Sequence, residues 1–267
     1  MKSFTGNALR WIWRDGVIEL TLDREPANEI GTAMLAELEQ FVAAFPALLP
    51  DTAVCIIHSS RRHGFSAGAD LRELYHTAAQ LSEKERLVGV RQFIERVHTV
   101  FNAIDGAPFT TIAAVTGVCF GGGFELALTC DILITDAMAR FAFPELRLGL
   151  IPGFGGIPRL KRDVGNAFIR DLLLTGRSVN AARAQSVGLG AQVVAEGETL
   201  RAARAAAAQI TKFDAVARTT AKKFVKPVPQ EELRREIELF CELFARPTVM
   251  AALKKFVESK DAMPYLP

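Results

Sequence analysis

The stretch GGGFELAL, residues 121–128, indicates the fold and the chemistry more strongly than any other part of the sequence. It comes shortly after the apolar run Thr110–Val115, which is typical of a buried strand. Three consecutive glycines permit backbone conformations closed to other residues and let a ligand approach closely. A helix then begins, and its first amides lack partners within the helix and point outward. Such a turn suits an oxygen atom that becomes negative during a reaction, although glycines alone also fit a tight turn that binds nothing.

Glu125 is the charged residue of this stretch. Its neighbours Phe124, Leu126 and Ala127 are apolar. A carboxylate in such surroundings is costly to bury unless it is hydrogen-bonded, protonated or used in chemistry. Burial also raises the pKa of a carboxyl group toward the range useful for acid–base catalysis. Glu125 is therefore a candidate catalytic residue, and the alternative is a position on an exposed polar face of the helix.

A second candidate carboxylate follows in FPELRLGLIPGFGG, residues 143–156. Pro144 stiffens the turn that presents Glu145. The glycines at the end of the stretch allow another close approach of the backbone. The alternatives for Glu145 are a solvated turn or an ion pair with Arg147.

A third loop, FSAGADL at residues 65–71, comes soon after the predicted buried strand Ala53–His58. Its small residues lead into a helical turn and are able to supply a second outward-pointing amide. The alternative is an ordinary helix start in which Asp70 is the N-cap.

Strands and helices alternate in the first part of the chain, which favours an α/β fold whose sheet is buried by helices. The predicted strands are Val17–Leu22, Ala53–His58, Thr110–Val115, Asp131–Thr135 and Ala139–Phe143. The predicted helices of this part are Thr32–Phe45 and Ser82–Ile104. Later patterns are helical at 166–174, 181–187, 200–210, 214–224, 231–244 and 248–259, with an extended segment at 191–194. We therefore expect a core over residues 1–211 and a helical region over 212–267.

Composition excludes several classes of protein. The chain of 267 residues has 32 basic and 30 acidic residues, a net charge of +2, which gives no electrostatic reason to expect nucleic acid or an anionic membrane as a partner. No GxGxxG opens a first βαβ unit, and no GxxxxGK[ST] loop is present. The cysteines form no CxxC pair, so buried reduced thiols are expected rather than a metal site. No signal peptide or membrane span is evident, and a cytoplasmic protein is expected.

Taken together and in this order, FSAGADL, GGGFELALTCDI, FPELRLGLIPGFGG and LTGRSVNAARAQSVGL resemble the crotonase (enoyl-CoA hydratase/isomerase) superfamily. The resemblance covers about residues 17–194. It implies a spiral of ββα units followed by a C-terminal helical region that mediates trimers or dimers of trimers. It also implies an acyl-CoA or acyl-carrier thioester as substrate, with no cofactor besides the coenzyme A that the substrate carries.

The resemblance also implies a site. The backbone amides of Ala67 and Gly122 match the two donors that hold the thioester carbonyl in this family. The loop Ala67, Gly68, Ala69 and Asp70 matches the segment along which coenzyme A binds. Glu125 and Glu145 match the two glutamates of the hydratases, which add water across, or remove it from, the 2,3 double bond. Relatives with one glutamate catalyse isomerisation or C–C bond hydrolysis, and a non-catalytic CoA-binding relative is a further alternative.

Several positions depart from the hydratase pattern. Ile157 and Pro158 stand where Thr-Gln is common, and Phe154 stands where a small residue is common, which narrows the expected pocket. Residues 26–30 read PANEI where Asn-Ala-Leu is usual, and residues 246–264 lack the usual acidic and basic patterns. These departures imply an unusual acyl group or carrier rather than an ordinary short-chain fatty enoyl group.

Overall fold

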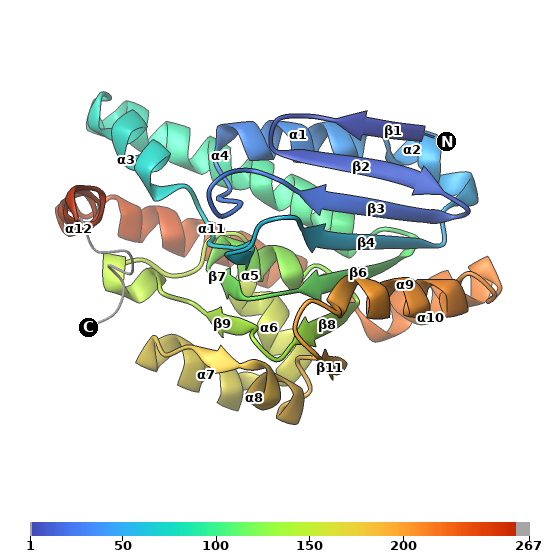
Figure 1. Ribbon diagram of the computed structural model, residues 1–267. Helices are drawn as coiled ribbons and strands as arrows, with labels where there is room; N and C mark the ends of the chain where they lie inside the picture. The colour runs from blue at the N-terminus through green and yellow to red at the C-terminus, as the bar shows by residue number, and fades with distance from the viewer. Residues whose placement is uncertain (1, 260–267) are drawn as a thin grey trace.

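The computed structural model describes residues 2–259, which form two β-sheets surrounded by helices (Figure 1). The larger sheet has seven strands in the order β1-β2-β3-β4-β6-β8-β11. Their bounds are β1 Lys2–Thr5, β2 Leu9–Arg14, β3 Val17–Leu22, β4 Val54–Ser59, β6 Thr110–Val115, β8 Ile132–Asp136 and β11 Gln192–Val194. The first three strands pair antiparallel, and every pair from β3 to β11 is parallel. The α/β class expected from the sequence is confirmed.

The smaller sheet has four very short strands in the order β10-β9-β7-β5. Their bounds are β5 Gly64–Ser66, β7 Val118–Phe120, β9 Arg140–Ala142 and β10 Val179–Asn180. β5, β7 and β9 are mutually parallel, whereas β10 pairs antiparallel with β9. The carboxyl ends of β5, β7 and β9 therefore meet at one edge of this sheet.

A repeated connection links the two sheets. Strands β4, β6 and β8 of the large sheet are each followed by one strand of the small sheet, namely β5, β7 and β9. Helices come next: α3 (Leu71–Ala79) and α4 (Glu83–Asp105) after β5, and α5 (Gly122–Ala127) after β7. After β9 come the 3-10 helix η2 (Glu145–Leu148) and α6 (Gly156–Val164).

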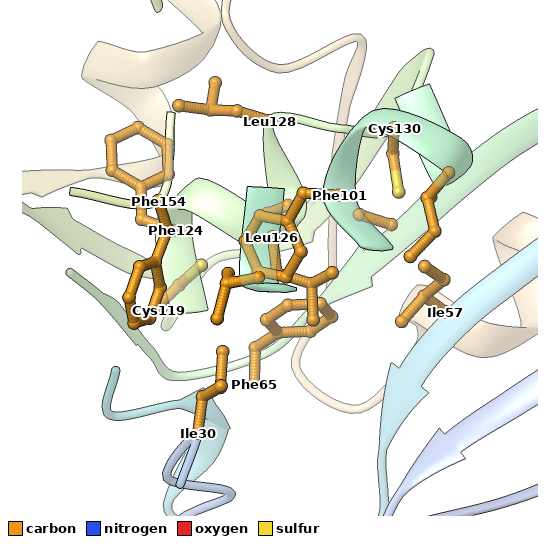
Figure 2. Packing of buried hydrophobic residues seen from close by; sticks show 14 of the residues in the cluster. Ile30, Ile57, Phe65, Phe101, Cys119, Phe124, Leu126, Leu128, Cys130 and Phe154 are labelled. Carbon is orange, nitrogen blue, oxygen red and sulfur yellow. The ribbon is translucent and has the colours of Figure 1, made fainter. Parts of the chain in front are cut away.

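Helices cover both faces of the large sheet because the parallel strands carry apolar side chains on both faces. On β4, Cys55 and Ile57 belong to the main core, which also includes residues of α1 (Thr32–Ala43) and α4. Val54 and Ile56 point to the other face and pack in a second cluster with α9 (Thr199–Ile210). Figure 2 shows part of the main core, to which Phe65 of β5, Cys119 of β7 and Leu126 of α5 contribute.

The C-terminal helices pack against the first half of the chain. α11 (Gln230–Phe244) contacts α4 and α6, and α12 (Pro247–Glu258) contacts α3 and η2. α10 (Ala215–Val225) has no buried residue. The remaining helices are α2 Phe45–Leu48, η1 Leu49–Asp51, α7 Asn166–Thr175 and α8 Ala181–Ser186. Within the described residues, no helix is both long and apolar enough to cross a membrane.

The predicted long strands and the predicted helices are confirmed, with bounds that differ by a few residues. Ser82 caps α4 in a capping box with Glu85, which explains why this helix starts where the sequence predicts. Strands β1 and β2 were not predicted, nor were β5, β7 and β10. Cys55, Cys119 and Cys130 are buried thiols as expected, whereas Cys241 is partly exposed.

Candidate active site

One cavity of about 340 Å³ lies where the loops after β5, β7 and β9 approach α3 and α4. All the site residues predicted from the sequence line it: Ala67, Gly68, Ala69, Asp70, Gly122, Glu125 and Glu145. Much of the remaining wall is apolar and comes from α3 and α4, through Leu71, Leu74, Ala78, Val90, Phe93 and Ile94. The cavity therefore has a polar end built by the small sheet and an apolar side built by two helices.

Two backbone amides border the polar end. A Cβ atom on Gly68 would lie 3.2 Å from the amide nitrogen of Gly122, and one on Gly122 would lie 3.3 Å from that of Ala69. Gly68 also has a φ of +103°, so both space and conformation require glycine there. Within residues 2–259, the amides of Ala69 and Gly122 donate no hydrogen bond. They are thus available to one oxygen atom of a ligand.

The amide of Ala67 is not available in the same way. It donates to the carbonyl oxygen of Ala27 at 2.9 Å, which ties the loop to the segment before α1. The Ala67 N–H, which the sequence assigned to the oxyanion site, therefore already has a partner in the structure. Ala69, two residues later, has the free amide beside Gly122.

Glu125 lies in the first turn of α5 and is only 2% exposed. Its Oε1 accepts hydrogen bonds from the amides of Phe154 and Gly156, each at 2.8 Å. Burial raises the pKa of Glu125 to about 7, although these two amides and the positive charge of Arg159 favour the ionised form. The alternative of an exposed helix face is excluded.

Glu145 begins η2 directly after Pro144 and approaches the glycine turn, since a Cβ atom on Gly121 would lie 2.6 Å from Glu145 Oε1. Its Oε2 is buried and has no hydrogen-bond partner within the described residues. Burial, and then repulsion from Glu125, raises the pKa of Glu145 well above its usual value. Arg147 donates instead to the carbonyl oxygen of Gly176, so it does not neutralise Glu145.

Four side chains hold the turn at residues 153–157, next to Glu125. His98 of α4 is within 2.9 Å of the carbonyl oxygen of Gly153, and burial lowers the pKa of this histidine to about 4. Arg159 donates to the carbonyl oxygen of Phe154 at 3.0 Å and pairs with the buried Asp105 at 2.8 Å. The remaining two are Glu125 itself and Glu236 of α11.

The family model for enoyl-CoA hydratase/isomerase matches residues 13–263 of the sequence. The chain belongs to this family. A probable enoyl-CoA hydratase of Rhizobium meliloti (strain 1021) is 36% identical over 249 residues, covering 91% of this chain and 92% of the relative. The 2,3-dehydroadipyl-CoA hydratase of Escherichia coli (strain K12) is 32% identical over 251 residues, covering 91% of this chain and 93% of the relative.

Solved structures agree with the fold. The crystal structure of enoyl-CoA hydratase from Bacillus halodurans matches with a TM-score of 0.82 and 24% identity, over 93% of this chain and 99% of that one. The resemblance to crotonases stated from the sequence is therefore confirmed, and the chain is a hydratase or a closely related enzyme of the enoyl-CoA hydratase/isomerase family.

Asp70 has a structural explanation within this family member. Its side chain accepts from the amide of Glu73 as the N-cap of α3, and it pairs with Arg24 at 2.6 Å. Asp70 is thus the helix cap that was the alternative to its assignment as a coenzyme A-binding residue, and its carboxylate helps fix the loop that carries the Ala69 amide. Phe154 also lies where predicted, in the cavity wall, and a Cβ atom on Gly122 would lie 2.7 Å from its ring.

Sequence reasoning missed Glu236, which is only 3% exposed. A signal for it was present, because Glu236 lies on the apolar stripe of α11 between Leu233 and Phe240, at spacings of three and four residues. A charged residue on such a stripe needs a buried partner. The departures noted at residues 260–264 lie outside the described residues. Within residues 2–259, no cluster of His, Cys, Asp or Glu is arranged to bind a metal ion.

Proposed function

We propose that the protein adds water across, or removes it from, the 2,3 double bond of an acyl thioester. The observation that carries this proposal is that the carboxyl groups of Glu125, which is buried, and Glu145, which is half-buried, repel each other in one cavity with two free amides. The two amides alone do not specify hydration, because an oxyanion site serves many reactions of acyl thioesters. A second carboxyl group provides the additional proton transfer that hydration needs.

The amides of Ala69 and Gly122 would donate to the thioester carbonyl oxygen. As the reaction proceeds, this oxygen gains negative charge, and fixed N–H donors stabilise it without reorganising at the moment of reaction. In related sites, loss of one such donor raises the barrier by about 3–4 kcal/mol. The helix that starts at Gly122 adds only a small favourable potential, since α5 is short.

The two glutamates would exchange protons with the substrate in a balanced step. Water attacks C3 and gives one proton to the carboxylate of Glu125, while the carboxyl group of Glu145 gives its proton to C2. The enolate formed on the carbonyl oxygen collapses as C2 is protonated. The hydrogen bonds that Glu125 accepts favour its ionised form, whereas the unpartnered Oε2 of Glu145 favours a protonated group. Because Glu125 and Glu145 titrate as a pair, this assignment of the base and the acid describes only their protonation before the substrate reacts.

The substrate would be an acyl group carried by coenzyme A or by an acyl carrier. Loop residues 67–70 lie at the polar end of the cavity, where the carrier arm would run, and no cofactor is needed beyond this carrier. The apolar wall of α3 and α4 suits an acyl chain. Phe154 narrows this space, which agrees with a substrate other than a simple short fatty enoyl group.

A homotrimer, or a dimer of trimers, is also part of the proposal, with residues 212–267 as the region that assembles it. α10 and the turn before it expose large apolar side chains, with Phe213 at 55%, Val216 at 74% and Phe224 at 87%. Several large apolar side chains exposed on one segment favour an interaction surface there. Light scattering coupled to size-exclusion chromatography measures the assembly, and a monomer at micromolar concentration contradicts it.

The test of the proposed reaction is loss of enoyl absorbance with crotonyl-CoA and with longer, branched and carrier-bound enoyl thioesters. Wild type, Glu125→Gln and Glu145→Gln are compared, with Glu232→Gln as the control, because Glu232 is an exposed glutamate paired with Lys161. Each site variant is expected to lose at least about 100-fold in kcat, while the control keeps wild-type activity. Chromatography of the products separates hydration from double-bond isomerisation and from C–C hydrolysis. A wild type that consumes substrates only by one of those two routes overturns hydration.

A further inference from the structure

The turn at residues 153–157 shares its backbone amides between two glutamates in strict alternation. Phe154 and Gly156 donate to Glu125, as described above. Gly155 and Ile157 donate to Oε1 and Oε2 of Glu236, at 2.6 and 3.0 Å. These residues form the N-terminal end of α6, whose first amides have no partners within the helix. Two carboxyl groups, one from each half of the chain, therefore hold this helix end from two sides.

Burying the carboxyl group of Glu236 costs free energy, and no residue of its own helix α11 offers it a hydrogen bond or an opposite charge. It lies between the apolar residues Leu233 and Phe240 of α11, and burial is the main reason that its pKa rises well above the usual value. The charged groups that face it are Glu125 from α5 and Arg159 from α6. Arg159 pairs with Asp105 of α4, which also pairs with Arg162 and Lys226. Glu125 is faced in addition by Glu145 of η2.

We propose that Glu236 is a positioning residue for Glu125: by fixing the amides of Gly155 and Ile157, it keeps the intervening amides of Phe154 and Gly156 directed at the Glu125 carboxylate. The inference rests on the proposed function in one respect, namely that Glu125 acts as the base. It makes the C-terminal helix α11 a working part of the site, although Glu236 touches no substrate.

The pattern of acceptors allows Glu125 and Glu236 to be distinguished by substitution. Both bonds to Glu125 end on the same oxygen, so a glutamine at position 125 retains both of them. Glu236 uses each oxygen once, so a glutamine at position 236 loses one bond. An aspartate at position 236 keeps a carboxyl group but is one methylene shorter, so its oxygens withdraw from both amides.

The experiment compares wild type, Glu236→Asp and the control Glu232→Gln, which alters the same helix one turn earlier at an exposed site. Infrared spectroscopy follows the pH titration of the buried carboxyl groups, and the band missing from Glu125→Gln identifies Glu125. Because the turn no longer directs two N–H donors at it, Glu125 is expected to titrate about one pH unit higher in Glu236→Asp. At pH 7 this lowers the ionised fraction, and hence kcat, by about fivefold with little change in KM.

A Glu236→Asp protein that folds and titrates like wild type overturns the inference, as does one that loses kcat without any shift in the Glu125 titration. If Glu236→Asp does not fold, Glu236→Gln replaces it, and an unshifted Glu125 band there has the same meaning. The infrared readout does not depend on turnover. A wild type without hydratase activity therefore counts against the proposed function, while the titration still decides the role of Glu236.

Discussion

The two sheets of the molecule differ in almost every respect that matters for function. The seven-stranded sheet contains the longest strands, and its parallel part is buried on both faces. The four-stranded sheet has strands of only two or three residues. Yet the candidate site residues follow strands of the small sheet: Ala69 comes after β5, Gly122 and Glu125 after β7, and Glu145 after β9. The large sheet contributes most of the core, to which Phe65, Cys119 and Phe141 of the small sheet also belong, and the small sheet positions the candidate site residues.

The difference has a physical basis. A long parallel strand satisfies its backbone within the sheet and stabilises the fold through apolar burial. A strand of three residues contributes little burial, but its end leaves backbone groups without partners in the sheet. Where three such parallel ends meet, their amides and side chains converge on a small volume. The predictions below test whether stability and catalysis are divided between the two sheets in this way.

The largest effect is expected for Gly122→Ala, at the end of β7. The new methyl group would lie 2.7 Å from the ring of Phe154, so the backbone must shift and its amide must move away from that of Ala69. We expect kcat to fall by about 100- to 1,000-fold, which corresponds to about 3–4 kcal/mol of barrier, because one oxyanion donor is misplaced. Steady-state hydration measures this loss, and circular dichroism checks the fold.

Gly89→Ala is the matched control for this substitution. Gly89 lines the same cavity from α4, but a Cβ atom there meets nothing within 4 Å. This variant is expected to keep wild-type kcat and to gain slightly in stability through its higher helix propensity. Equal activity of the two folded variants would show that the Gly122 amide is not a donor in the reaction.

The next effect concerns stability and its dependence on pH. Glu125 has a pKa near 4.5 when unfolded and about 7 when folded, so the unfolded chain loses its proton first as the pH rises. Since one pKa unit is worth about 1.4 kcal/mol, ionisation of Glu125 costs the fold about 3 kcal/mol above pH 8. Urea unfolding should therefore show Glu125→Gln gaining stability over wild type between pH 5 and pH 8.5.

Glu19 on β3 of the large sheet provides the opposite case. It pairs with Arg204 of α9 at 2.7 Å, and this hydrogen bond lowers its pKa. The ionised form is thus favoured in the folded state, and its contribution is present above the unfolded pKa and lost as the pH falls. Relative to wild type, Glu19→Gln should lose stability at neutral pH and recover it in acid. If Glu125→Gln and Glu19→Gln changed the free energy of unfolding in the same direction at neutral pH, the environments assigned to these two glutamates would be wrong.

What the sequence could predict follows the same division. The strands β3, β4, β6 and β8 have five or six residues with a clear apolar pattern, and all four were predicted. Strands β5, β7 and β10 are too short to show any periodicity. Of the hairpin strands, β2 has three consecutive bulky apolar residues between two arginines, whereas β1 is largely exposed and carries little signal.

Site residues that act through their side chains could be predicted from the sequence, whereas those that act through backbone amides were harder to predict. The surroundings of Glu125 and Glu145 made them candidates, and the resemblance of the motifs to crotonases matched them to the two glutamates of the hydratases. Ala67 was named for one of the two donors because sequence does not reveal which amides already have partners, and within the described residues Ala67 donates to Ala27 whereas the amide of Ala69 is free. Glu236 is 81 residues from the turn it contacts at Gly155, a distance that no local pattern spans.

The smallest expected effects come from one substitution in each sheet, and they test most directly whether the two sheets have different roles. Ile112 of β6 and Cys119 of β7 are both fully buried, and each can lose a small group without adding a polar one. Ile112→Val removes one methyl group from the cluster under α9 and should cost about 1 kcal/mol of unfolding free energy with unchanged kcat. Cys119→Ala should cost a similar amount but also lower kcat several-fold, since it loosens the strand that sets the position of Gly122. Thermal unfolding and steady-state kinetics on the two variants measure both quantities. If Ile112→Val lowers kcat as much as Cys119→Ala does at equal stability, then the large sheet also positions the site, and the division between core and chemistry does not hold.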